Sequence, residues 1–265
     1  MAGQTVRSSC VPFSLSGGVA QVRLSRPGAN NAINDEMVHG LAAAVDELEA
    51  SAARAALICG DGAHLTVGGD LDHLAGVDEL PDELAAIVPV YHDVLMRLAG
   101  LDIPVVCAAQ GVVAGGGLGL LWCADTVIAA SDLRLTAGFA GLGLSGDGGS
   151  SWALPRMVGR RRARQLLLFG RQLDAGQALE WGLVDQVVEP ERLLDEAQAQ
   201  AARLADGPTV AYGHIKRLLR YSDQHTLAEQ LEAERAAMVA CAATEDAREG
   251  ILSFAERRRA EFKGC

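Results

Sequence analysis

The chain has 265 residues, of which 49% are hydrophobic and 4% aromatic, and it contains 30 glycines. This length is enough to bury a sizeable core, and the composition favours a layered α/β protein with many close backbone approaches. The formal net charge of −11 repels a phosphate backbone, which argues against nucleic acid as a partner.

Cysteine usage and the apolar segments indicate a cytoplasmic protein outside the membrane. The six cysteines form no C-x-x-C pair, which is typical of reduced thiols. Residues 1–10 are polar and predict no secretory signal. The most apolar window, 104–130, is interrupted by Gln110, by glycines and by Asp125, which argues against a membrane span.

The first half of the chain predicts strands and helices in alternation. The expected elements are a hairpin over 11–15 and 19–24, a helix over 34–50 capped by Asn34, a strand over 55–59, and a helix from Pro89 to Ala99. We place Pro89 at the first position of its helix because proline in a helix interior removes a hydrogen bond.

The second half predicts shorter strands and then mostly helix. We expect a strand over 104–108, a helix over 118–123, strands over 126–130 and 133–135, and a helical region over 148–258 interrupted by a strand at 183–188. Glycines 141, 143 and 146 spell G-x-G-x-x-G, but no acidic residue follows at about twenty positions and no βαβ unit surrounds them. A dinucleotide site is therefore disfavoured.

Glycines mark two junctions at which a strand is followed by a helix, Gly68-Gly69 and Gly115–Gly117. A missing Cβ lets a ligand approach the backbone there, and N–H groups of a first helical turn point outward without partners. If the two junctions lie side by side, their N–H groups can polarise one carbonyl oxygen, which is the arrangement of an oxyanion hole. The alternative is two tight turns packed against neighbouring strands.

Several other side chains have plain structural interpretations. Asp70, Asp72 and His73 fit a solvated helix start better than a metal site, and no metal-binding motif is present. We expect His64 and His73 in surface loops, and Trp152 and Trp181 in the core.

A series of motifs recurs in order along nearly the whole chain. The motifs are Arg26-Pro27 with Asn31-Ala32, Gly68-Gly69-Asp70-Leu71, Pro104-Val105 leading to Gly111 and Gly115-Gly116-Gly117, Gly143-Leu144 before Asp147-Gly148-Gly149, Leu154-Pro155-Arg156 with Gly159, Glu180-Trp181-Gly182-Leu183-Val184, and Glu249-Gly250 with Phe254 and Glu256-Arg257-Arg258. In these motifs the chain resembles the enoyl-CoA hydratase/isomerase (crotonase) superfamily.

The resemblance implies an α/β fold, a spiral of ββα units followed by a C-terminal helical region that packs in homotrimers, often paired into hexamers. Residues 1–205 would form the core with the CoA-thioester site, and residues 206–265 would pack on the core and on neighbouring subunits. The ligand would be an acyl-CoA, so coenzyme A is part of the substrate and no separate cofactor is expected.

The resemblance also implies where the ligand binds. The N–H groups of Gly69 and Gly116 would hold the thioester oxygen. The pantetheine and adenine would lie near a second set of residues: Arg26, Ala29, Val67, Asp70 and Leu71. Arg257 or Arg258 would approach the nucleotide phosphate, either in the same subunit or in a neighbour.

Hydratases of the family place two carboxylates at positions that match Gly119 and Phe139 here, and neither residue can move a proton. Asp147 is the remaining acidic candidate, at a point of the loop where certain isomerases carry a catalytic aspartate and aryl-CoA dehalogenases carry a nucleophile. Its structural alternative is an N-cap of the following helix.

His92 is the second candidate, because it lies twelve residues before Pro104, the spacing of a catalytic histidine in the dehalogenase branch. A tryptophan of that branch, eight residues before the aspartate, matches Phe139. The alternative is a half-buried helix histidine with an ordinary hydrogen-bond partner.

The leading hypothesis is therefore a CoA-thioester double-bond isomerase that uses Asp147 as its acid and base, with Gly69 and Gly116 stabilising an enolate. Three alternatives stay open: an enoyl-CoA hydratase in the broad sense, an aryl-CoA dehalogenase or hydrolase with Asp147 as nucleophile and His92 as base, and a non-catalytic acyl-CoA-binding subunit.

Overall fold

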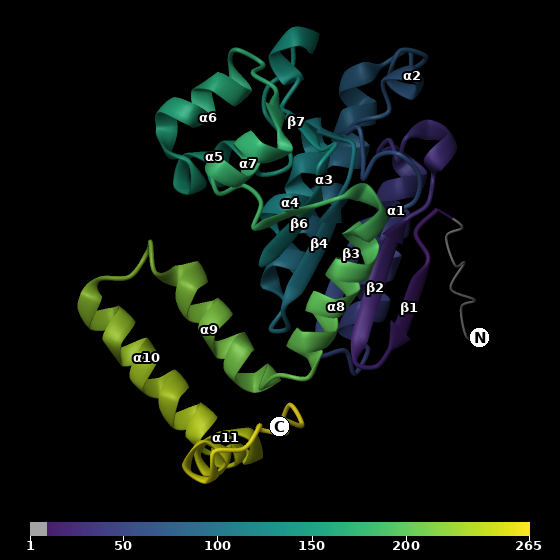
Figure 1. Cartoon of the computed structure of the whole chain (residues 1–265). Coiled ribbons are helices and arrows are strands. Elements are labelled where there is room, and N and C mark those ends of the chain that lie inside the picture. The colour runs from purple at the N-terminus through teal and green to yellow at the C-terminus, as the bar shows by residue number, and fades with distance from the viewer. Residues whose placement is uncertain (1–9) are drawn as a thin grey trace, which may run out of the picture.

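A computed structural model describes residues 10–265 (Figure 1). Residues 1–9, on which the expectation of no secretory signal rests, lie outside the described residues. The main sheet has the order β1-β2-β3-β4-β6-β9 and is parallel except for the β1–β2 hairpin. Its strands are β1 (Phe13–Ser16), β2 (Val19–Leu24), β3 (Ala55–Gly60), β4 (Val105–Ala109), β6 (Thr126–Ala130) and β9 (Gln186–Val188).

A second, smaller sheet has the order β5-β7-β8, formed by β5 (Val112–Ala114), β7 (Arg134–Thr136) and β8 (Leu173–Asp174). Each of the pairs β4–β5 and β6–β7 therefore sends its first strand to the main sheet and its second to the smaller one. This is the α/β spiral of ββα units that the resemblance implies. The sequence did not predict β5 and β8, which have three and two residues.

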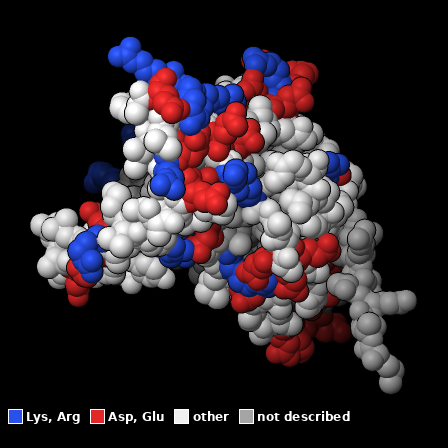
Figure 2. All heavy atoms as spheres, turned by 90° about the horizontal axis from the view of Figure 1, so that it is seen from below, with Lys and Arg blue, Asp and Glu red and all other residues white. Residues whose placement is uncertain are grey.

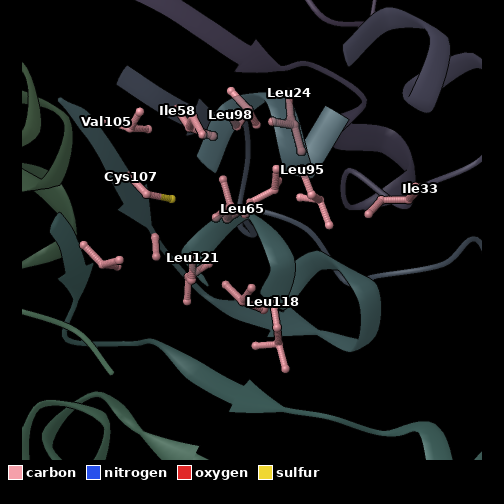
Figure 3. Packing of buried hydrophobic residues seen from close by; sticks show 14 of the residues in the cluster. Leu24, Ile33, Ile58, Leu65, Leu95, Leu98, Val105, Cys107, Leu118 and Leu121 are labelled. Carbon is pink, nitrogen blue, oxygen red and sulfur yellow. The ribbon is translucent and has the colours of Figure 1, made fainter. Parts of the chain in front are cut away.

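Helices cover both faces of the main sheet. Successive side chains of its central strands point to opposite faces, and both sets are apolar and buried. Leu57, Val106 and Ile128 face α8 (Leu193–Ala205) on one side. Ile58, Val105 and Cys107 face the opposite side, where α1 (Asp35–Glu49) and α3 (Leu80–Gly100) pack on each other. Figure 3 shows the side chains of this larger core, with Leu65 among residues from both strands and helices.

The predicted start of α3 is wrong: the helix begins at Leu80, Pro81 occupies its first turn, and Pro89 lies in its interior. Pro89 itself is exposed, whereas Ile87, Tyr91 and residues further along the same stripe are buried. Burial of that stripe against α1 and the core offsets the hydrogen bond that Pro89 cannot donate.

The remaining helices fall into a set of short helices and a C-terminal arm. The short helices are α2 (Leu71–Leu74), α4 (Leu118–Trp122), α5 (Ser150–Met157), α6 (Gly159–Leu167) and α7 (Ala175–Glu180). Of these, α7 contacts β7 and β8 of the smaller sheet, and α4 contacts β4 of the main sheet. Single 3-10 turns are η1 (Pro27–Ala29), η2 (Gly115–Gly117), η3 (Phe139–Leu142) and η4 (Pro190–Arg192). The arm consists of α9 (Thr209–Tyr221), α10 (Leu227–Ala242) and α11 (Glu245–Glu256), and it extends away from the sheets (Figure 1).

The arm is tied to the core mainly at its base. Lys216 of α9 bonds the carbonyl of Ile103 and the carboxylate of Asp125, and Arg54 donates to the carbonyls of Gly207 and Phe262. The helices also carry large apolar side chains at the surface: Leu219, Leu227, Met238, Ile251 and Phe254. The division at residue 205 and the contacts with neighbouring subunits stay predictions.

The surface shows no large area of one charge on the side where α10 and α11 lie. Figure 2 shows basic and acidic side chains interspersed there, separated by broad uncharged areas. Within residues 10–265, no helix combines the length and the apolar character needed to cross a bilayer.

Candidate active site

The two glycine-rich corners lie side by side. Thr66 pairs with Val113 in an isolated parallel bridge, and the N–H of Ala114 donates to the Thr66 carbonyl at 3.2 Å. Gly68 has a φ of +85°, and a methyl group built on its Cα would lie 2.6 Å from the Ala114 carbonyl oxygen. Only glycine permits this approach, which brings the segment 66–69 against the start of η2.

Each corner presents an N–H group without a partner among the residues that the structure describes. Around Gly69 the bridge to Ile33 uses the Gly68 carbonyl and the Asp70 N–H, so the N–H of Gly69 points away from Ile33. Gly116 lies in the first turn of η2, where an N–H has no intrahelical acceptor. Both glycines line the same cavity, and an oxyanion hole would need two such N–H donors.

A cavity of about 600 Å³ opens in front of both corners. Its wall is mostly apolar and includes Val67, Leu71, Leu74, Leu84, Ile87, Val88, Phe139, Leu142 and Leu144. Asp147 and His92 are the charged or titratable groups of the wall other than the phenol of Tyr91, among the described residues. A cavity of this size can hold an apolar ligand whose polar group is fixed by a few convergent donors and acceptors.

Asp147 lies on the loop between η3 and α5 and meets His92 of α3. Oδ1 of Asp147 is 2.5 Å from Nε2 of His92, and the side chains are 29% and 46% exposed, respectively. Oδ2 lies 3.3 Å from the position of a methyl group built on Gly116, so the carboxylate is next to the Gly116 corner. One oxygen of Asp147 is thus oriented by the imidazole, and the carboxylate lies on the cavity wall beside Gly116.

The N-cap interpretation of Asp147 is wrong. Helix α5 begins at Ser150, two residues later than expected, and its N-cap is Gly149 with no side-chain hydrogen bond. Gly148 explains why the loop comes so close: its φ is +59°, and a methyl group built there would lie 2.4 Å from the Gly116 carbonyl oxygen. A glycine at 148 therefore lets the loop rest directly on η2.

Position 119, where hydratases of the family carry a carboxylate, has no space for a side chain. A methyl group built on Gly119 would lie 2.7 Å from Cδ1 of Leu95 and 2.8 Å from the Gly148 carbonyl oxygen. The loop that carries Asp147 fills the volume that a side chain at 119 would need. The second matching position, Phe139, contributes an apolar ring to the cavity wall.

The residues expected to hold the coenzyme divide into three groups. Val67 and Leu71 line the cavity. Arg26 and Asp70 form an ion pair at 3.1 Å that is mostly buried, and Arg26 also donates to the Ala32 carbonyl. Ala29 lies in η1, on the segment that this pair fastens to the start of α2.

Arg257 and Arg258 follow α11, which lies at the opposite end of the molecule from α2 in Figure 1. Arg258 is already paired with Glu249 and Glu256. Because two elements far apart in one view are at least that far apart in space, α11 and α2 are not neighbours. Within one chain, the residues that follow α11 therefore lie away from α2.

The plain structural interpretations are only partly correct. Asp70 is the N-cap of α2, accepting from the N–H of His73, and Trp181 is buried. Trp152 is 57% exposed rather than in the core. His64 lies in a loop as expected, but it is half-buried, and its Nδ1 accepts from the N–H of Val112 at the start of β5. Across residues 10–265 no group of three His, Cys, Asp or Glu side chains is arranged to hold a metal ion.

Sequence analysis gave Tyr91 no role, and the structure places it in the buried stripe of α3. The hydroxyl of Tyr91 donates to the Gly116 carbonyl at 2.9 Å. Burial, and then the neighbouring Cys123 and Asp147, raise the pKa of Tyr91 well above its ordinary value, so the phenol stays neutral. The signal in the sequence is a tyrosine at a buried position where a phenylalanine would pack equally well. A buried tyrosine hydroxyl usually needs a hydrogen-bond partner.

Comparison with known proteins finds matches along most of the chain. The family model described as enoyl-CoA hydratase/isomerase matches residues 14–265. A 1,2-epoxyphenylacetyl-CoA isomerase of Escherichia coli (strain K12) is 39% identical over 250 residues, covering 93% of this chain and 95% of the relative. A 4-chlorobenzoyl coenzyme A dehalogenase of Arthrobacter sp is 30% identical, covering 82% and 80%. The crystal structure of an enoyl-CoA hydratase from Polaromonas sp. JS666 has a TM-score of 0.90 at 30% identity, covering 96% and 99%.

Proposed function

The chain belongs to the enoyl-CoA hydratase/isomerase family, and from that premise we propose that it moves a double bond within an acyl-CoA thioester. Asp147 is the acid and base of this reaction, and the N–H groups of Gly69 and Gly116 hold the thioester oxygen. The Escherichia coli relative described above, which is 39% identical to this chain, is named as an isomerase of a CoA thioester.

The reaction begins when the carboxylate of Asp147 takes a proton from a carbon next to the double bond. The electrons of that C–H bond pass through the conjugated system to the thioester oxygen, which becomes an enolate. Two fixed N–H donors stabilise this negative charge, and removing one donor of such a pair costs on the order of 10²- to 10³-fold in kcat. Asp147 then returns the proton to another carbon of the chain, and the double bond has moved.

The observation that carries the proposal is the position of one carboxylate. Asp147 is the single acidic side chain on the cavity wall among the described residues, and it lies beside Gly116. An isomerisation needs one group that removes and returns a proton on one face of the substrate. His92 bonds Oδ1 of Asp147 and so orients the carboxylate toward the cavity.

Ordinary hydration is less well supported. Adding water needs one group to activate the water and another to deliver the second proton. Gly119 and Phe139 supply neither, and the volume beside Gly119 is filled by Leu95 and the Gly148 carbonyl. Efficient hydration of crotonyl-CoA by the purified protein would contradict this reasoning.

The test is exchange of solvent deuterium into a bound acyl-CoA. We expect the wild-type protein to catalyse exchange and Asp147→Asn to reduce it at least about 10²-fold, the range of a lost general base, with coenzyme A binding retained. The control is Asp93→Asn, because Asp93 is the neighbour of His92 on α3 and pairs with Arg97 instead of facing the cavity. Equal exchange by the wild type and Asp147→Asn would remove the assignment, and coenzyme A binding without any wild-type exchange would indicate the non-catalytic subunit.

A second candidate follows from the contact between Asp147 and His92. In a dehalogenase-like reaction Asp147 attacks an aryl carbon that bears a halogen, halide leaves, and a water activated by His92 hydrolyses the aryl ester. The 30% identity to the dehalogenase supports it. An aryl adduct on Asp147 after one turnover of 4-chlorobenzoyl-CoA, detected as a mass increase, would favour this candidate over the isomerase.

A further inference from the structure

Two consecutive residues of α3 reach the two halves of the site. The hydroxyl of Tyr91 donates to the carbonyl of Gly116 at 2.9 Å, and the imidazole of His92 bonds the carboxylate of Asp147. The proposed reaction uses Asp147 and His92 but assigns nothing to Tyr91. Its phenol is 3% exposed and lies in an otherwise apolar stripe of the helix.

The Gly116 carbonyl accepts from two donors, the hydroxyl of Tyr91 and the N–H of Leu118 at the end of η2. On one side it accepts from Tyr91, and on the other the backbone of Gly148 lies so close that a methyl group there would be 2.4 Å from the oxygen. A buried carbonyl that loses one of its donors has one lone pair left without a partner, which costs free energy. The hydroxyl of Tyr91 therefore satisfies a group that water cannot easily reach.

The residue that this hydrogen bond restrains lies in a run of three glycines. Gly115, Gly116 and Gly117 lack the Cβ that limits backbone rotation in other residues, and Gly115 has a φ of +52°. A small rotation at Gly116 would swing its N–H away from the oxygen that it is to hold. Fixing the carbonyl of the same residue limits that rotation.

We propose that Tyr91 is a positioning residue, whose buried hydroxyl holds Gly116 in the orientation that aims its N–H at the thioester oxygen. The inference rests on the proposed function, since it takes Gly116 as an oxyanion donor. Through adjacent residues of one helix, α3 then sets both the oxyanion corner and, by way of His92, the carboxylate of Asp147. Catalytic groups need this kind of support, because displacement of a group by about 1 Å can cost 10²-fold in rate.

The decisive variant is Tyr91→Phe, which removes one oxygen and keeps the ring that fills the stripe. We expect kcat for isomerisation to fall about tenfold to 10²-fold, less than or equal to the loss of a whole donor, while KM changes by less than about twofold. The control is Val94→Ala, because Val94 is fully buried on the same helix and does not line the cavity. It lowers the melting temperature without this loss of kcat.

A spectroscopic measurement separates positioning from general loosening of the fold. Cinnamoyl-CoA absorbs at longer wavelength when its thioester oxygen is polarised, so its red shift on binding reports the strength of the oxyanion hole. Tyr91→Phe should reduce the shift, and Val94→Ala should retain the wild-type shift. Tyr91→Leu, which fills the space differently, is a second variant without the hydroxyl and should also show a reduced shift.

An unchanged red shift and an unchanged kcat in Tyr91→Phe would overturn the inference and leave the proposed function standing. A loss of both that Val94→Ala reproduces would also overturn it, because the effect would then be one of stability. A wild-type protein that gives no red shift and no deuterium exchange would refute the proposed function, and the role of Tyr91 with it.

Discussion

At the scale of single residues, three glycines make room for the loop that carries Asp147. Gly116 supplies the N–H, Gly148 lies against the carbonyl of Gly116, and Gly119 leaves a space that the Gly148 carbonyl and Leu95 occupy. A side chain at 119 or 148 would push the loop away from η2, and one at 116 would press on the carboxylate of Asp147. The carboxylate is placed by the absence of side chains around it as much as by its hydrogen bond to His92.

We therefore expect Gly119→Ala to destabilise the protein by about 1–3 kcal/mol, the usual cost of overpacking a filled interior. The added methyl group would meet atoms of Leu95 and Gly148 at 2.7 Å and 2.8 Å. The matched control is Gly141→Ala, because a methyl group at Gly141 meets nothing within 4 Å. Urea denaturation of both variants measures the difference, and equal stability would show that position 119 is not crowded.

The sequence allows candidate residues to be chosen by their chemistry, but it does not show which of them are in contact. The two glycine corners carry a local signal, whereas the choice of Gly69, Gly116 and Asp147 as site residues comes from the resemblance to the family. The bond between His92 and Asp147 joins residues 55 positions apart, and only the fold shows it. Tyr91 could not be separated from the apolar stripe, because periodicity records that a ring is buried and not what its hydroxyl meets.

At the scale of elements, the long helices and buried strands were predictable and the short strands were not. Helix α1 has a side-chain cap at Asn34 and an apolar stripe, and both lie within the helix or next to it. Strands β5 and β8 exist because they pair with β7, which is a tertiary property. Helix α3 continues through Pro89 for the same reason, since packing on α1 outweighs the local preference.

The C-terminal segment after α11 is held by charge, and this predicts a pH dependence. Hydrogen bonds from Arg258 and from the N–H of Glu261 lower the pKa of Glu249 to about 2. The pKa of Glu249 in the folded protein lies below the ordinary glutamate value. The interaction between Glu249 and Arg258 therefore stabilises the segment fully at any pH above that ordinary value. The support is lost as the pH falls toward about 2.

Titration of the Glu249 carboxyl by ¹³C NMR measures this shift directly. We expect Arg258→Gln to return the pKa toward the ordinary glutamate value, and 1 M salt to weaken the shift because the pair is exposed. Arg248→Gln on the same helix is the control and should leave the pKa of Glu249 unchanged. An ordinary pKa in the wild type at low salt would contradict the hydrogen-bonded arrangement.

At the scale of the whole molecule, the arm of α9–α11 has many large apolar side chains that a single chain leaves exposed to solvent. Phe254 is 86% exposed, and Leu227, Met238 and Ile251 are each more than 70% exposed. Large apolar patches on a soluble protein commonly mark interfaces between subunits. We propose that copies of the chain cover this surface in a homotrimer or hexamer, which would also bring Arg257 or Arg258 of one copy near the coenzyme of another.

Phe254→Asp should weaken this assembly, because burying a charge at an apolar interface is unfavourable. Sedimentation velocity is expected to show three or six copies for the wild type and smaller species for the variant. Glu234→Gln, on the exposed surface of α10, is the control and should leave the assembly unchanged. A wild-type protein that sediments as a monomer at micromolar concentration would refute the interface.

The most direct test of the account is the structure of the protein with an unreactive acyl-CoA bound. We expect the thioester oxygen to lie about 2.7–3.1 Å from the nitrogens of both Gly69 and Gly116, the distances of an oxyanion hole. We also expect a carboxylate oxygen of Asp147 within contact of the carbons between which the proton moves. A thioester oxygen bound away from either glycine, or an acyl chain that does not reach Asp147, would contradict the central claim.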